Sequence, residues 1–317
     1  MSEVVTLGES MVAFVPDTAG PLRHADRFSR TVAGAESNVA IGLSRLGHAT
    51  TWISLLGDDA FGRYIWATLR GEGVDLRYAR LDPRAPTGVM FKERLPAGES
   101  RVSYYRHGSA AALLDAGDVP NTAFVGAKWL HLTGITPALG PGPERAVRRA
   151  IGLARAAGTA ISFDPNYRAR LWSPERARPV LLDLARDVDL LVLGESEGEL
   201  MFSTSSAAAT LRAALDLGCR LVALKRAERG ALLMAAGATS PDSVPAYPVV
   251  LVEPTGAGDA FAAGLLSGLL EGRSHQDAAR LAALCGALAC TVVGDWEGAP
   301  ERYLAERCLS GMPDSPR

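Results

Sequence analysis

Four short runs of β-forming residues decide the fold of this chain: Trp129-Leu-His-Leu-Thr133, Thr159-Ala-Ile-Ser-Phe-Asp164, Leu190-Leu-Val-Leu193 and Leu221-Val-Ala-Leu-Lys225. Segments rich in Ala, Leu and Arg separate them, and their apolar residues recur every three to four positions, as on one face of a helix, at 144–157, 174–185 and 207–217. Strands that alternate with helices form parallel sheets with helices on the faces. The stretch therefore predicts an α/β fold.

Two segments interrupt this alternation, at residues 12–30 and 88–106. The second contains two β-forming runs on either side of the turn-forming tripeptide Ala97-Gly98-Glu99, and so predicts a β-hairpin. Strands inserted early in such a chain can form a small second sheet over the ends of the main strands. We expect a single α/β domain over residues 1–317 with these segments as its lid, because no linker rich in Pro, Gly or Ser divides the chain.

The composition argues against several classes of protein. Of the 317 residues, 48% are hydrophobic and 21% are charged, which is ordinary for a globular enzyme. A formal net charge of −2 leaves no excess of cations for binding a nucleic-acid backbone. The four cysteines have neither CxxC nor zinc-ligand spacing, so we expect no disulfide and no structural zinc.

Neither a targeting segment nor a membrane span is expected. Residues 1–9 lack the basic region and the long apolar region of a secretion signal, and they predict a first strand instead. The longest uncharged apolar stretch, 281–294, is shorter than the roughly 18–20 residues that a membrane-spanning helix needs. It predicts a buried helix. We therefore expect a cytoplasmic protein with no membrane partner.

The strongest local signal for chemistry is Glu253-Pro-Thr-Gly-Ala-Gly-Asp-Ala-Phe261, whose glycines stand directly before an Ala- and Leu-rich helical run. Backbone N–H groups at a helix N-terminus attract an anion, and small side chains let a phosphate approach the backbone. Asp259 would then lie beside that phosphate. The alternative is that Asp259 is only a favourable carboxylate in the first turn and that the glycines only form a tight turn.

A second signal is the segment from Val32 to Gly47, which predicts a helix with small residues at its entry. Gly34 and Asn38 could present polar groups to a ligand while the apolar residues pack inward. The alternative is an ordinary helix start with a core stripe. The combination of the two segments favours the binding interpretation.

Both segments resemble the two signatures of the PfkB carbohydrate kinases, in the same order and with similar separation. Gly57-Asp-Asp-Ala-Phe-Gly62, typical of the family near the end of its third strand, and Phe163-Asp-Pro-Asn-Tyr-Arg168 extend the resemblance over nearly the whole chain. The resemblance implies a ribokinase-like three-layer α/β/α fold with a mostly parallel central sheet and a small β-sheet lid. It also implies transfer of a phosphoryl group from ATP to a sugar, with Mg²⁺.

By this resemblance, Asp259 is the general base that takes the proton of the acceptor hydroxyl, and Gly256, Ala257 and Gly258 form the anion hole. Phosphoryl transfer depends mainly on positioning and charge stabilisation, which agrees with the interpretation from the residues alone. Glu253 stands where the family signature has Asp, and Pro254 follows it. We therefore do not expect the monovalent-cation site that some members build there.

The predicted nucleotide contacts match the family less well. Gly194-Glu195-Ser196-Glu197 resembles an Asn-x-x-Glu motif with Gly194 in place of Asn, and it implies nucleotide contact by Ser196 and water-mediated contact of Glu197 with magnesium. The segment 225–230 resembles a Lys-x-Gly-x-x-Gly turn with Ala227 in place of its first glycine. It implies ATP contacts by Lys225, Glu228 and Gly230.

Ala287 lies on a predicted helix whose small residues, as in the family, could leave room for adenine. Tight helix packing is the alternative for Ala287, and a plain lysine at the end of a strand is the alternative for Lys225.

The substrate prediction depends on two arginines, Arg106 and Arg168, because an acidic sugar needs its carboxylate neutralised, best by a bidentate guanidinium. Both resemble the carboxylate-binding positions of 2-keto-3-deoxygluconate kinases, and Tyr104 and Gly34 match further substrate contacts. Met90 stands where that subfamily has another tyrosine. The alternatives are an exposed Arg106 on a hairpin, and an Arg168 paired with Glu175 or another carboxylate.

The sequence thus predicts an ATP-dependent 2-keto-3-deoxygluconate kinase that feeds an Entner–Doudoroff-type route. One alternative is a fructokinase or another ribose or hexose kinase, in which the two arginines would have no carboxylate to bind. Another is a sugar-binding protein without catalysis, which the departures at Gly194 and Ala227 suggest and the presence of Asp259 opposes. The exposed edges of the lid strands predict a homo-oligomer, a dimer or larger.

Overall fold

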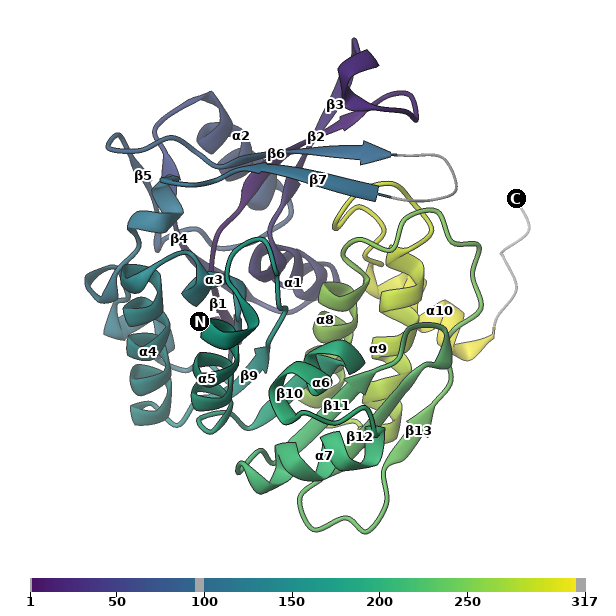
Figure 1. The fold of residues 1–317 in the computed structure, drawn as a ribbon. Coiled ribbons are helices and arrows are strands. Elements are labelled where there is room, and N and C mark those ends of the chain that lie inside the picture. Colours follow the sequence, from purple (N-terminus) through teal and green to yellow (C-terminus); the bar gives the residue numbers. More distant parts are fainter. Residues whose placement is uncertain (1, 95–99, 312–317) are drawn as a thin grey trace.

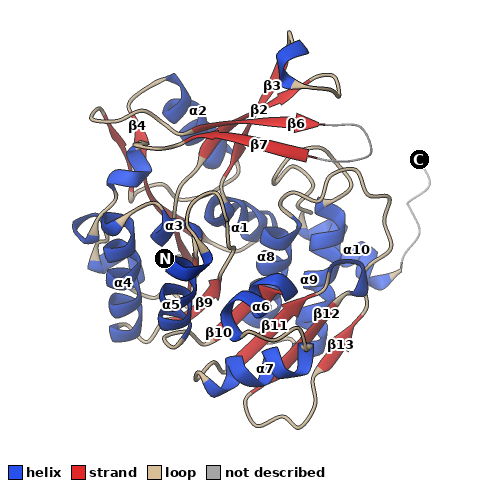
Figure 2. Ribbon diagram, viewed as in Figure 1, coloured by secondary structure: helices blue, strands red, loops and turns tan. Residues whose placement is uncertain are grey.

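The computed structural model describes residues 2–94 and 100–311, and within them the chain forms two sheets (Figures 1 and 2). The main sheet has the order β13-β12-β11-β10-β9-β8-β1-β4-β5. All its neighbours pair in parallel except β11–β12 and β12–β13, which are antiparallel. Its strands are β1 (Val4–Leu7), β4 (Thr50–Gly57), β5 (Ala79–Asp82), β8 (Trp129–Thr133), β9 (Ala160–Asp164), β10 (Leu190–Gly194), β11 (Leu221–Lys225), β12 (Ala231–Ala235) and β13 (Asp242–Val244).

The four runs that predicted the fold are β8, β9, β10 and β11, adjacent and parallel as expected. Their register places Thr133 opposite Asp164, and Gly194 opposite Lys225. The carboxyl ends of these strands therefore lie at one edge of the sheet, where ligands bind in open α/β folds. The motif 57–62 lies at the end of β4, which is the fourth strand in chain order and not the third, because β1 and two strands of the second sheet precede it.

Helices cover both faces of the main sheet (Figure 1). On one face the core joins strand residues such as Leu132 and Leu193 to Val147 and Leu181 of the helices. On the other, Val4 and Val192 pack with Val39 and Phe261. The first face carries α4 (Pro141–Ala156), α5 (Pro174–Ala185), α6 (Glu195–Phe202) and α7 (Ala207–Asp216), and the second carries α1 (Ala35–Arg45), α8 (Ala257–Leu270) and α9 (His275–Ala289).

The remaining helices are short or peripheral. They are α2 (Ala60–Gly71), which packs beside the lid, α3 (Ile135–Ala138) and α10 (Arg302–Ser310). The predicted helix at 174–185 has those bounds in the structure, whereas the one predicted from residue 144 begins earlier, at Pro141. Proline suits the first turn of a helix because it lacks only an N–H group that would have no partner there. No helix of the described residues is long and apolar enough to cross a membrane.

The second sheet is the predicted lid, with the order β3-β2-β6-β7. Its strands are β2 (Met11–Pro16), β3 (Phe28–Ala33), β6 (Val89–Arg94) and β7 (Ser100–Tyr105). Residues Val32 and Ala33, expected at the entry of the first helix, belong instead to β3, because they pair with Val12 and Met11. The hairpin of β6 and β7 is confirmed, and its predicted turn at 97–99 lies outside the described residues.

Candidate active site

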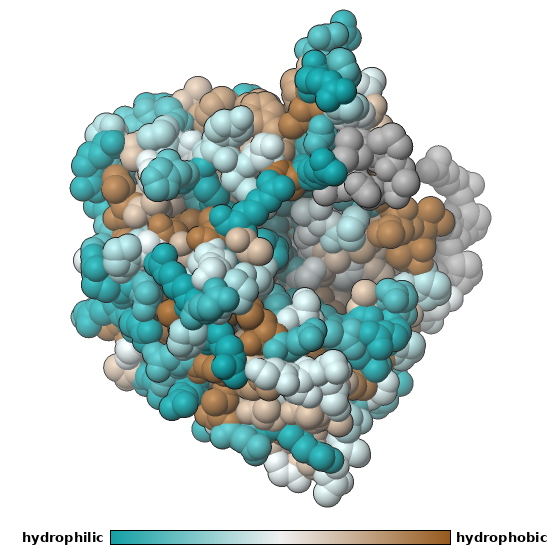
Figure 3. Space-filling model, in the orientation of Figure 1, coloured by the Kyte–Doolittle hydropathy of each residue, from teal (hydrophilic) through white to brown (hydrophobic). Residues whose placement is uncertain are grey.

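A cavity of about 390 Å³ lies between the lid and the carboxyl edge of the main sheet. The space-filling view shows the molecule hollowed beneath the lid strands (Figure 3). The cavity brings together residues from both signature segments, the lid and the strand ends. Among the predicted site residues that line it are Gly34, Asn38, Tyr104, Arg106, Arg168, Glu197, Lys225, Gly256, Gly258 and Asp259.

The glycine-rich segment forms a turn that only glycine can adopt at its centre. Gly256 has a φ of 79° and caps the N-terminus of α8, which begins at Ala257. A side chain at Gly256 would place its Cβ 1.6 Å from the backbone oxygen of Asp295. The first N–H groups of a helix lack intrahelical acceptors and attract anions. The N–H of Ala257 already donates to the Pro254 carbonyl (3.3 Å), whereas the N–H groups of Gly256 and Gly258 have no backbone acceptor among the described residues.

Asp259, in the first turn of α8, meets the second signature segment directly. The side-chain amide of Asn38 on α1 donates to Asp259 Oδ2 at 2.8 Å. Burial raises the pKa of Asp259 to about 7, with a further rise from Asp164, although the Asn38 hydrogen bond and the positive charges of Arg168 and Lys225 oppose it. A carboxyl group with a pKa near neutrality is well matched to proton abstraction at physiological pH.

Lys225, Asp164 and Glu197 form a second group of charged side chains at the ends of strands β9, β10 and β11. Lys225, at the end of β11, donates to Asp164 Oδ2 of β9 at 2.5 Å. Burial lowers the pKa of Lys225, but Asp164 and Glu197 outweigh it, so the pKa is raised and the ammonium stays charged. The carboxylate of Glu197 accepts the N–H groups of Tyr167 (2.9 Å) and Gly194 (2.7 Å). Glu197 therefore orders the start of its own helix as well as the turn after β9.

Asp164 and Glu197 offer the oxygen chemistry that Mg²⁺ prefers, and both line the cavity. Each is already engaged, Asp164 by Lys225 and by the N–H of Asn166, and Glu197 by two N–H groups. No cluster of three or more His, Cys, Asp or Glu side chains is arranged to hold a metal within residues 2–94 and 100–311. Carboxylates that are already engaged in this way leave room for an ion bound through its water shell, and the role of Glu197 toward magnesium stays a prediction.

Arg106 is buried and paired, unlike the exposed hairpin residue considered as its alternative. Only 8% of it is exposed, and its Nε donates to Glu9 Oε2 at 2.7 Å. Ser109 Oγ donates to the other oxygen of Glu9 at 2.6 Å, and the guanidinium lies 5.6 Å from the ring centre of Tyr104. Arg106 is not on the hairpin because β7 ends at Tyr105. It begins the following turn, in which the N–H of Ser109 donates to the Arg106 carbonyl at 3.1 Å.

Arg168 follows β9 and is exposed at the mouth of the cavity. The predicted alternative, an ion pair with Glu175, is not found among the ion pairs of the described chain. Among the described residues the guanidinium makes one weak hydrogen bond, from Nη1 to the carbonyl of Tyr167 at 3.3 Å. Most of its donors are therefore available to a ligand.

Of the residues predicted to contact ATP, Lys225, Gly256 and Gly258 line this cavity. Four others do not: Ser196, Glu228, Gly230 and Ala287. Ser196 is exposed in the first turn of α6, and Glu228 is exposed in the turn after β11. Gly230 is buried with a φ of 78°, and Ala287 lies on α9, which packs against α8. Their roles toward ATP stay predictions.

The sequence patterns did not identify four charged residues that line the cavity: Glu9, Lys92, Asp164 and Asp295. The motif 163–168 contains Asp164, but the prediction used only its arginine. Lys92 could have been found by its spacing, because side chains alternate along a strand and Met90 of the same strand was already placed at the substrate. Met90 does line the cavity, where the resemblance led us to expect a tyrosine. Glu9 and Asp295 have no local signal.

The family model "pfkB family carbohydrate kinase" matches residues 1–302 of this chain. A 2-dehydro-3-deoxygluconokinase of Bacillus subtilis is 39% identical over 314 residues, covering 98% of this chain and 96% of its own. One from Thermoproteus tenax is 35% identical over 98% of this chain and 95% of its own. A fructokinase of Klebsiella pneumoniae is 36% identical over 97% of this chain and 99% of its own.

Solved structures share the fold. The 2-dehydro-3-deoxygluconokinase of Thermotoga maritima superposes with a TM-score of 0.91 at 28% identity, covering 98% of both chains. A putative ribokinase II from E. coli in complex with ATP and Mg²⁺ superposes with the same TM-score and identity, covering 98% of this chain and 100% of its own.

Proposed function

We propose that this chain, which belongs to the pfkB family of carbohydrate kinases and is an ATP-dependent sugar kinase, phosphorylates 2-keto-3-deoxygluconate to the 6-phosphate. This acceptor is the same compound as the 2-dehydro-3-deoxygluconate in the names of the Bacillus and Thermoproteus relatives. It combines hydroxyl groups with a carboxylate at one end, so its enzyme must bind a negative charge away from the reacting hydroxyl.

The observation that carries the proposal is the largely unpaired guanidinium of Arg168 at a cavity that also contains Asp259. Arginine binds a carboxylate through two parallel hydrogen bonds, which sets orientation as well as affinity. Arg106 keeps its Nη1 edge for the same carboxylate while its Nε edge binds Glu9. Tyr104 and the backbone at Gly34 line the space between, where the sugar would lie.

In this proposal Asp259 removes the proton of the terminal hydroxyl as the phosphoryl group arrives. Asn38 orients the carboxylate, and the N–H groups at the start of α8 bind the phosphoryl oxygens, so the charge that develops meets fixed dipoles. ATP is the donor, and Mg²⁺ would neutralise part of its phosphate charge. Asp164 and Glu197 are the carboxylates that would contact the water shell of the ion.

A fructokinase is the second candidate, because the Klebsiella relative carries that name at 36% identity. A neutral sugar has no carboxylate for Arg168 to bind, and this is the feature that distinguishes the two acceptors. The sugar-binding protein without catalysis, which the departures at Gly194 and Ala227 suggested, is opposed by the family and by its named kinase relatives. Retention of the base and of the anion-binding turn favours an active enzyme.

We also propose that residues 1–317 act as one kinase domain and that the protein forms a homo-oligomer. The lid sheet ends at β3 on one side and β7 on the other, and the edges of such strands can pair with a second copy. Light scattering coupled to size-exclusion chromatography tests this, and a mass of one chain would contradict it.

The experiment that tests the acceptor is a coupled assay of ADP release with MgATP and 2-keto-3-deoxygluconate, fructose or ribose. Wild type is compared with Asp259→Asn and with Asp183→Asn, a matched change at a surface aspartate that pairs with Arg148. Turnover of the acidic sugar that is lost only in Asp259→Asn is expected. Preferred turnover of fructose or ribose would refute the acceptor, and no turnover of any sugar would support the binding protein.

A further inference from the structure

Lys92 is a buried lysine of the lid that makes two ion pairs with the body of the molecule. It lies on β6, and only 1% of it is exposed. Its Nζ is 2.7 Å from Glu253 Oε1 and 2.5 Å from Asp295 Oδ1. A buried ammonium group is costly unless carboxylates surround it, so this arrangement is specific rather than incidental.

Both carboxylates belong to the scaffold of the glycine-rich turn. Glu253 Oε1 accepts the hydroxyl of Thr255 at 2.8 Å, and its Oε2 accepts the N–H of Gly294 at 3.2 Å. The backbone oxygen of Asp295 fills the space beside Gly256 that any side chain would need. Lys92 thus holds together the two segments that determine the conformation of Gly256.

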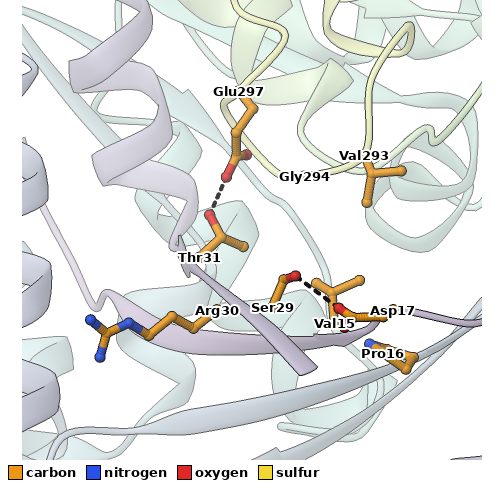
Figure 4. A pocket seen from close by; sticks show the side chains of 9 residues that line it. All are labelled: Val15, Pro16, Asp17, Ser29, Arg30, Thr31, Val293, Gly294 and Glu297. Atoms are coloured by element: carbon orange, nitrogen blue, oxygen red, sulfur yellow. Dashed lines mark hydrogen bonds between the residues drawn. The ribbon is translucent and has the colours of Figure 1, made fainter. Parts of the chain in front are cut away.

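The segment 294–299 is also attached to lid strand β3 and to helix α1. Glu297 accepts the hydroxyl of Thr31 on lid strand β3 and the N–H of Asp295 (2.9 Å). Figure 4 shows Thr31 and Glu297 pointing toward each other across a neighbouring pocket. Arg45 of α1 donates to the carbonyls of Glu297 (3.1 Å) and Ala299 (2.8 Å). The segment is therefore anchored on two sides, and Lys92 adds a charged link between it and Glu253 to the hydrogen bond from Gly294.

Charge explains why the position needs a cation. Without Lys92, the carboxylates of Glu253 and Asp295 would lie buried beside one another with no counter-charge, next to the site that receives a phosphoryl group. Burial raises the pKa of Asp295, and the positive charge of Lys92 opposes this rise. Removing the lysine would push the two carboxylates apart and displace the turn.

We propose that Lys92 is a positioning residue for phosphoryl transfer, which holds the turn at Gly256 in its anion-binding conformation through Glu253 and Asp295. It acts through these carboxylates and does not bind the acceptor. The inference rests on the proposed anion-binding role of the turn but not on the identity of the acceptor.

The test compares Lys92→Met, the double variant Lys92→Met/Asp295→Asn and the control Lys128→Met, which removes a half-exposed lysine paired with Glu3. Each is assayed with whichever acceptor the wild type phosphorylates. A wrong acceptor assignment would therefore be evident from the substrate preference of the wild type and would not affect the comparison of the variants. We expect Lys92→Met to lower kcat about 100-fold, as for a misplaced catalytic group. The acceptor KM should change less than about threefold, and the double variant should recover kcat at least about fivefold because the net charge is restored. Lys128→Met should match the wild type.

Three results would overturn the proposal. Unchanged kcat in Lys92→Met would show that the turn does not need the lysine. A raised acceptor KM with unchanged kcat would show that Lys92 binds the acceptor directly. A double variant that folds, as judged by thermal unfolding, but recovers no activity would show that the two carboxylates do not transmit the effect. If Lys92→Met itself does not fold, the double variant still decides between these outcomes, since it removes the excess buried charge.

Discussion

The lid wall and the body wall of the cavity differ in how each holds its arginine. On the lid side, Lys92 and Arg106 are 1% and 8% exposed, and both form ion pairs with carboxylates of the protein. On the body side, Lys225 is paired with Asp164, but Arg168 is exposed and makes one weak hydrogen bond to a carbonyl. Arg106 and Arg168, which were both predicted to bind a carboxylate, therefore differ in burial and in pairing.

This difference separates cations that stabilise the site from a cation that is available to a ligand. A buried charge whose partner is removed destabilises the protein by about 3–5 kcal/mol, whereas an exposed one can be replaced at little cost. Arg106 should therefore contribute to both folding and binding, and Arg168 almost entirely to binding. Variants of the proposed base, which lies between the two walls, and of the two arginines test this separation.

Asp259→Asn should have the largest effect. The amide keeps the size of the side chain but cannot accept the proton, so kcat should fall about 10²–10⁴-fold while the fold is retained. Steady-state ADP release measures the loss, and thermal unfolding verifies the fold. Residual activity above a tenth of the wild-type value would show that a group other than Asp259 is the base.

Arg106→Gln should lower stability, because it leaves Glu9 buried without its counter-charge. We expect a loss of about 3–5 kcal/mol in the free energy of unfolding, measured by urea denaturation. The double variant Arg106→Gln/Glu9→Gln should recover much of this stability but not the affinity for the acidic sugar. If Arg106→Gln were as stable as the wild type, the buried ion pair of Arg106 with Glu9 would not contribute to stability, and the contrast with Arg168 would be wrong.

Arg168→Gln should change specificity with little change in stability. Loss of charge-assisted hydrogen bonds worth about 1.5–3 kcal/mol predicts a fall of about 10- to 100-fold in kcat/KM for 2-keto-3-deoxygluconate. Turnover of fructose should change little. Equal losses for both sugars would mean that Arg168 does not bind the carboxylate. Arg176→Gln, at an exposed arginine on helix α5, is the matched control.

The pH dependence should show the smallest effect. Because the base must be ionised, and burial raises the pKa of Asp259 to about 7, kcat/KM should rise as pH increases through about 7 and then level off. The charge of Arg168 lowers this pKa, so Arg168→Gln should move the acid limb to higher pH. Rate profiles for the free enzyme measure both positions. A limb that stays in place, or moves to lower pH, would contradict the influence of Arg168 on Asp259.

Much of the fold was predictable from short-range patterns. The family and the ribokinase-like fold are confirmed, as are the parallel strands between Trp129 and Lys225 and the lid hairpin. Gly34, Asn38 and Asp259 could be placed together from the sequence because they lie in dense local motifs, and all three line the cavity. The residues predicted to contact ATP rest on weaker motifs, because Gly194 and Ala227 interrupt these motifs and no local pattern replaces them.

The amino-acid sequence by itself determined the α/β architecture, the lid and the glycine-rich turn beside Asp259, because periodicity, turn residues and helix starts are properties of neighbouring residues. Only the tertiary structure decided which charged side chains are paired with other side chains of the protein. Glu9 meets Arg106 across 97 positions, Lys92 meets Glu253 across 161, and Asn38 meets Asp259 across 221. Burial and pairing of charges depend on which distant segments the fold brings together, and no local pattern of residues encodes that.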